Sequence, residues 1–146
     1  MIPLTFVSSS PDKFREVREL LVPLGIRVLW EKRAILEPQA EELDAVVRAK
    51  LDAVADLKGF VLVEDSGLFI DSLHGFPGVY SAHFLRIWGL ERLLELLRRR
   101  PRGAAYRAAS GLRRGRESWI VHGEVEGAIA RRAAGRNGFG YDPIFV

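Results

Sequence analysis

The feature that most constrains the fold is an apolar run that leads directly into two acidic residues. Residues 59–63 read Gly-Phe-Val-Leu-Val, and Glu64, Asp65 and Ser66 follow at once. The run predicts a buried strand, and we expect this strand to end at Val63, because an unpaired carboxylate is costly to remove from water. Carboxylates at the end of a strand can hold a hard divalent cation. Asp-Ser-Gly is also ordinary surface-turn chemistry, so both interpretations stay open at this point.

Strand-like and helix-like segments alternate through the first half of the chain. This order favours an α/β fold with parallel strands. The expected strands are 2–7, 26–30 and 60–63, and the expected helices are 11–24 and 41–58. Pro11 is suited to the first position of a helix, and Gly25 and Gly59 are suited to helix ends. After a turn cluster at 75–78, we expect a helix over 87–100 and two antiparallel strands over 104–112 and 118–129.

Composition places the chain among ordinary globular proteins. It has 146 residues, of which 48% are hydrophobic and 28% charged, a size suited to a single domain over 1–146. It contains no Cys, which excludes disulfides and thiolate metal sites and fits a cytoplasmic protein. No apolar stretch is long enough to span a bilayer, so we expect no membrane partner.

Basic residues concentrate between positions 98 and 116, although the net charge is only +3. Such a cluster can bind nucleic acid or a polyphosphate. It can equally be a solvated helix end followed by a charged hairpin. We favour the second interpretation, because aromatic residues do not interleave with the arginines as a base-stacking surface requires.

The segment from Ser8 to Lys13 (Ser-Ser-Ser-Pro-Asp-Lys) joins the first expected strand to the first expected helix. The start of a helix attracts anions through its free N–H groups and its dipole. Ser10, or Ser9 together with Asp12, can also simply cap the helix. Capping does not account for a lysine in the first turn, where a cation is disfavoured. The segment therefore predicts a phosphate-binding turn made by Ser8, Ser9, Ser10 and Lys13.

Two further segments carry candidate functional residues. Glu37 lies in the loop between the second strand and the second helix, where an acid is usually solvated. It gains meaning as a partner of Glu64 and Asp65 around Mg²⁺, which binds a few carboxylates together with substrate phosphates. Residues 138–143 read Gly-Phe-Gly-Tyr-Asp-Pro. Flanking glycines allow the backbone to approach a flat ligand, although a hairpin or bulge is the simpler interpretation.

Taken in order, these motifs resemble the inosine triphosphate pyrophosphatase family over essentially the whole chain. The matching blocks are Ser-Ser-Ser-Pro-Asp-Lys-Phe-Arg-Glu-Val, Leu-Glu-Pro-Gln-Ala-Glu, Val-Glu-Asp-Ser-Gly-Leu-Phe-Ile-Asp-Ser-Leu, Gly-Phe-Pro-Gly-Val-Tyr-Ser-Ala and Gly-Phe-Gly-Tyr-Asp-Pro-Ile-Phe. The resemblance implies an elongated mixed β-sheet flanked by helices, with two lobes and a central cleft, usually as a homodimer. It also implies a Mg²⁺-dependent hydrolase that converts ITP, dITP or XTP to the monophosphate and pyrophosphate.

The resemblance also implies roles for individual residues. Residues 8–13 would form the triphosphate-binding turn, with Lys13 on the phosphates. Glu37 and Asp65 would hold Mg²⁺ with Glu64 close by, and Asp65 would orient or deprotonate the attacking water. Ser66 would contact the substrate. The base pocket would be lined by Phe139, Gly140, Tyr141 and Asp142, with Phe139 stacking on the purine.

Two departures from the family pattern bear on these expectations. Ser10 stands where the family usually has Asn, which removes one amide donor. The chain also lacks the family's usual C-terminal loop and helix, which close on the nucleotide and discriminate the base. A relative that binds nucleotides with little or no turnover is therefore an alternative to an active enzyme. A basic nucleic-acid-binding domain is a second alternative.

Overall fold

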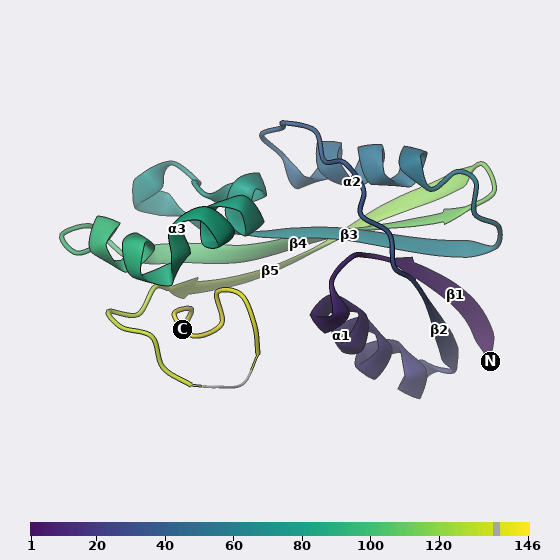
Figure 1. Ribbon diagram of the computed structural model, residues 1–146, viewed down its shortest axis with the longest axis horizontal. Helices are drawn as coiled ribbons and strands as arrows, with labels where there is room; N and C mark the ends of the chain where they lie inside the picture. Colours follow the sequence, from purple (N-terminus) through teal and green to yellow (C-terminus); the bar gives the residue numbers. More distant parts are fainter. Residues whose placement is uncertain (136–137) are drawn as a thin grey trace. The chain divides into compact units, whose positions relative to one another are not determined.

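The computed structural model describes residues 1–135 and 138–146 (Figure 1). The helices are α1 (Pro11–Leu21), α2 (Leu43–Ala53) and α3 (Ser81–Leu96), and short 3-10 turns cover Val22–Leu24, Asp71–Leu73 and Gly78–Tyr80. The strands are β1 (Ile2–Val7), β2 (Ile26–Glu31), β3 (Phe60–Ile70), β4 (Gly103–Arg114) and β5 (Glu117–Ala128). They form one sheet in the order β2-β1-β3-β4-β5.

The sheet is mixed, which confirms the predicted α/β fold of a mixed sheet flanked by helices. β1 pairs in parallel with both β2 and β3. β4 and β5 are neighbours joined only by Gly115 and Arg116, a connection that requires an antiparallel pair. None of the described helices has the length and apolar composition needed to cross a membrane.

The chain divides into two compact units, and each is described by itself. The first comprises residues 1–40, 44–65 and 109–121, and the second comprises 41–43, 66–108 and 122–146. The assignment of 1–146 to a single domain stays a prediction, as does the central cleft.

In the first unit, α1 and α2 cover opposite faces of the parallel strands. The chain passes from β1 to β2 through α1, and from β2 back across β1 to β3 through α2. Because parallel crossovers are right-handed, two crossovers in opposite directions place their helices on opposite faces, as Figure 1 shows. The core under α2 is apolar, and its buried side chains are Val46, Val47, Leu51, Val54, Val61 and Val63.

Helix α1 is held differently, since none of its residues is fully buried. Its main aromatic contact is between Phe14 and Trp30 of β2, whose rings stack with centroids 4.8 Å apart. The α-helix ends at Leu21 and continues as a 3-10 turn, because Pro23 has no N–H to donate. Gly25 then stops the segment with a φ of 82°, at the predicted position.

Strand β3 is longer than predicted, and this is the main correction to the sequence interpretation. We expected it to end at Val63, but it continues through Glu64 and Asp65 to Ile70. The physical premise still holds, because neither carboxylate is left without a cation. Lys13 lies beside Glu64 and Lys50 lies beside Asp65. Paired charges can lie in a strand interior where unpaired ones cannot.

The core of the second unit contains Leu68, Ile70, Leu93, Leu97, Ile129 and Ile144, all at most 2% exposed. Helix α3 begins at Ser81, earlier than the predicted start at 87. It is broken at Gly89, whose φ of 79° and ψ of 172° are non-helical. Gly67 of β3 allows a close approach, because a Cβ there would lie 2.2 Å from the carbonyl oxygen of Gly78. The two strands predicted after Pro101 are confirmed as β4 and β5.

Candidate active site

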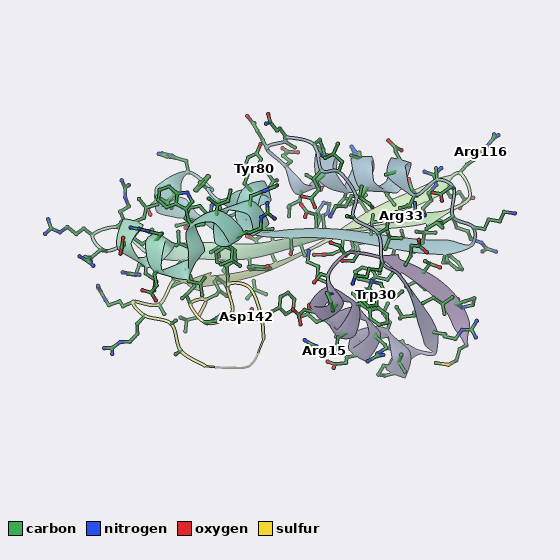
Figure 2. All side chains as sticks on the ribbon, viewed as in Figure 1. Arg15, Trp30, Arg33, Tyr80, Arg116 and Asp142 are labelled. Atoms are coloured by element: carbon green, nitrogen blue, oxygen red, sulfur yellow. The ribbon has the colours of Figure 1, made fainter. Side chains whose placement is uncertain are left out.

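The predicted phosphate-binding turn lies between the end of β1 and the start of α1. Ser10 is the N-cap, and its Oγ accepts a hydrogen bond from the N–H of Lys13 at 3.2 Å. The Oγ of Ser8 accepts one from the N–H of Ser10 at 3.1 Å. The indole Nε1 of Trp30, labelled in Figure 2, donates to the carbonyl oxygen of Ser8 at 2.9 Å. The helix-cap interpretation is thereby confirmed, and Ser9 between the two hydroxyls is exposed.

Lys13 reaches across to β3. Its Nζ lies 2.8 Å from Oε2 of Glu64, and the side chains are 27% and 15% exposed. The contact is an ion pair between two partly buried side chains. The lysine predicted to meet phosphates is therefore paired with a carboxylate in the free protein.

Lys50 of α2 is a residue of the candidate site that the sequence interpretation missed. Its Nζ lies 2.9 Å from Oε1 of Glu37 and 3.7 Å from Oδ1 of Asp65, and it donates to the carbonyl oxygen of Glu64 at 2.9 Å. A signal was present in the sequence. Lys50 occupies the apolar face of its helix, three residues after Val47 and four before Val54. A lysine in the middle of an apolar face is a candidate for a buried ion pair.

Asp65 is the most deeply buried of the three acids, with 5% of its surface exposed. Burial is the chief cause that raises its pKa to about 6, and the negative charges of Glu37 and Glu64 act in the same direction. The positive charges of Lys50 and Lys13 oppose the rise. Its Oδ2 is buried without a hydrogen-bond partner. A desolvated carboxylate with an unused oxygen is suited to bind a cation or to accept a proton.

The predicted convergence of three acids is divided between the two faces of the sheet. Successive side chains of a strand point to opposite faces. Glu64 accordingly meets Lys13 of α1, whereas Asp65 and Glu37 meet at Lys50 of α2. Among residues 1–135 and 138–146, no three acidic or histidine side chains lie close enough to form a complete metal cluster. Glu37 and Asp65 fit a hard cation that takes its other ligands from water and substrate.

The loop that carries Glu37 is anchored by Arg33, which Figure 2 labels. The guanidinium donates to both carboxylate oxygens of Asp56, at 3.0 and 3.1 Å, beyond the end of α2. This hydrogen bonding lowers the pKa of Asp56. Planar two-point contacts of this kind fix orientation as well as distance. The loop is therefore attached near the end of the helix that presents Lys50 to Glu37.

The remaining predicted residues lie in the second unit. Ser66 Oγ is 3.4 Å from the hydroxyl oxygen of Tyr106. The N–H of Phe139 donates to Oδ2 of Asp142 at 2.8 Å. Tyr141 is buried, and its hydroxyl donates to the carbonyl oxygen of Ser81 at 2.6 Å. Burial raises the pKa of Tyr141. Gly138 and Gly140 both adopt positive φ. Substrate contacts by Ser66 and by residues 139–142 stay predictions.

Comparison with known proteins gives a consistent picture. The model of the Ham1 family matches residues 4–146. A protein of Pyrococcus horikoshii named dITP/XTP pyrophosphatase is 40% identical over 97% of this chain and 77% of its own length. One of Ignicoccus hospitalis with the same name is 42% identical, over 97% and 77%. The crystal structure of a nucleoside-triphosphatase, dITP/XTP pyrophosphatase, from Mycobacterium abscessus is similar with a TM-score of 0.75 and 33% identity, over 99% of this chain and 83% of that one. The structure of a HAM1 protein from Coxiella burnetii gives a TM-score of 0.82 at 29% identity, over 99% and 81%.

Proposed function

Because the chain belongs to the Ham1 family, we propose that it hydrolyses non-canonical purine nucleoside triphosphates such as dITP, XTP and ITP. The products are the nucleoside monophosphate and pyrophosphate. The observation that carries the proposal is the buried Asp65 carboxylate, which has an unused oxygen and lies beside Lys50 and Glu37. Two lysines and a helix N-terminus in the same unit supply the positive charge that a triphosphate requires.

Glu37 and Asp65 are the residues that would hold a divalent metal, and we propose Mg²⁺. Both present carboxylate oxygens, the donors that Mg²⁺ prefers, and two carboxylates with substrate phosphates are its usual ligand set. When bound, the metal would neutralise phosphate charge and polarise the bond to be broken.

The protein's own residues have distinct roles in this proposal. Lys13 and the N-terminus of α1 bind the phosphate chain, and Lys50 keeps Glu37 and Asp65 together. Asp65 orients a water molecule and accepts its proton as the water oxygen attacks the α-phosphorus. The bond from the α-phosphorus to the bridging oxygen breaks, and pyrophosphate leaves. Ser66, Phe139, Gly140, Tyr141 and Asp142 would bind the nucleoside. We also propose a cytoplasmic homodimer.

The test is pyrophosphate release from a panel of nucleoside triphosphates, with Mg²⁺ and with EDTA. We expect Mg²⁺-dependent release from dITP and XTP, and far slower release from ATP and GTP. Asp65→Asn should lower kcat by about 100-fold or more, since it removes the proton acceptor. Asp52→Asn is the matched control: Asp52 lies on the exposed side of α2, so activity should change less than about twofold.

Two results would contradict the proposal. Full activity of Asp65→Asn would remove its proposed role in the reaction. Tight binding of dITP by calorimetry without any pyrophosphate release would instead support a nucleotide-binding protein that lacks turnover.

A further inference from the structure

The proposed reaction leaves the ion pair between Lys13 and Glu64 without a role. Lys13 is a cation in the first turn of α1, where the helix dipole disfavours positive charge. Its Nζ lies 2.8 Å from a Glu64 oxygen, and the side chain of Glu64 is 15% exposed. The pair is thus partly shielded from water. Two charges interact more strongly in such a place than on an open surface.

Glu64 is set apart from the carboxylates that fit a cation. It precedes Asp65 in β3 and therefore points to the opposite face of the sheet. Its carboxylate meets Lys13 of α1, and its main-chain carbonyl accepts from Lys50 of α2. The Glu64 carboxylate therefore pairs with Lys13, the lysine of the phosphate-binding turn.

A carboxylate in contact with this lysine opposes the binding of any other anion there. A phosphate that approaches the ammonium group must displace Glu64 or share the ammonium with it, and in both cases two negative charges repel each other. A polyphosphate that carries a bound divalent cation has less net charge and meets less of this repulsion. A bare polyphosphate meets all of it.

We propose that Glu64 is a positioning residue that holds Lys13 in the free protein and weakens the binding of metal-free phosphates. The inference rests on the proposed function, since it takes Lys13 as the phosphate-binding lysine. It gives Glu64 a part in ligand selection: the residue makes occupation of the turn depend on the metal that accompanies the substrate.

The test measures binding of inorganic tripolyphosphate by calorimetry in EDTA, so that neither metal nor turnover contributes. Glu64→Gln keeps the size of the side chain and removes the charge. We expect it to bind tripolyphosphate tighter than the wild type by on the order of tenfold. The gain should vanish in the double variant Lys13→Met/Glu64→Gln, because the effect acts through the lysine ammonium.

Asp52→Asn is the matched control for net charge. Asp52 lies on the exposed side of α2, outside the phosphate-binding turn. We expect its effect on tripolyphosphate binding to be less than about twofold. Should Glu64→Gln fail to fold, Glu64→Asp is the second variant, because it retracts the charge by one methylene. We expect its affinity for tripolyphosphate to exceed that of the wild type by less than the roughly tenfold expected for Glu64→Gln.

Unchanged metal-free binding in Glu64→Gln would overturn the inference. So would a loss of binding seen only with Mg²⁺, because that result identifies Glu64 as a cation ligand. The proposed function fails on different data, namely the absence of dITP and XTP turnover by the wild type.

Discussion

Asp65 places an ionisable group in an environment that favours its neutral form, and this has a consequence for stability. Burial raises its pKa from 3.8 to about 6. Between these values the folded protein holds a proton that the unfolded chain releases. The protonated Asp65 carboxyl therefore makes its full contribution to the free energy of unfolding below about pH 4. This contribution is lost as pH rises through 6.

We expect the metal-free wild type to lose up to about 3 kcal/mol of unfolding free energy between pH 4 and pH 7.5, relative to Asp65→Asn. Asp65→Asn cannot titrate at this position, so the difference between the two proteins isolates the carboxyl group from all others. Urea unfolding in EDTA at pH 4, 6 and 7.5 measures it. Equal pH profiles for the two proteins would contradict the raised pKa.

At the scale of elements, the contact of α2 with β4 depends on a residue without a side chain. A Cβ on Gly111 would lie 2.6 Å from Cγ1 of Val47 and 2.9 Å from Cδ1 of Leu51. We expect Gly111→Ala to destabilise the protein by about 1–3 kcal/mol, because both neighbours are buried core side chains with little room to move. Gly123→Ala in β5 is the control, since a Cβ there meets no atom within 4 Å. The two variants should differ in urea midpoint, and similar midpoints would show that α2 can shift at little cost.

The elements also show which parts of the fold and site follow from local sequence. The helix expected over 41–58 is found as α2, shorter at both ends, and Pro11 and Gly25 predicted where the first helical segment begins and ends. The length of β3 could not be predicted in this way. Whether two acids can lie within a strand depends on cations supplied by other helices, and the sequence does not state which lysines will reach them.

In the candidate site too, contacts within one turn were predictable and contacts between distant elements were not. The helix cap at Ser10 is a contact within one turn, and it was predictable from residues 8–13. The ion pair of Lys50 with Glu37 joins a helix to a loop, and the predicted grouping of Glu37, Glu64 and Asp65 did not include it. The alternation of β3 directs the Glu64 and Asp65 side chains to different lysines, and a metal-binding role for Glu64 stays a prediction.

At the scale of the whole molecule, four of the eight arginines between positions 98 and 116 make contacts within the protein. Arg102 donates to the carbonyl oxygen of Ala130, and Arg107 pairs with Glu124. Arg113 donates to the carbonyl oxygen of Leu51, and the Arg114 guanidinium lies 4.8 Å from the centre of the Phe60 ring. These contacts favour a structural role over a nucleic-acid surface.

We therefore expect no specific binding of duplex DNA or single-stranded RNA, and only weak binding at low salt. Fluorescence anisotropy with labelled oligonucleotides at 50 and 200 mM salt measures this. Micromolar or tighter binding that weakens steeply with salt would contradict the expectation, because a slope of that kind reports phosphate contacts by several arginines.

The alternation of β3 bears on how variation in this chain is interpreted. Glu64 and Asp65 are adjacent in the sequence, but their side chains have different surroundings. A change at 64 alters the neighbourhood of an ammonium group, and a change at 65 alters a desolvated acid. We therefore expect substitutions at the two positions to have different effects, although the charge of Glu64 also contributes to the raised pKa of Asp65.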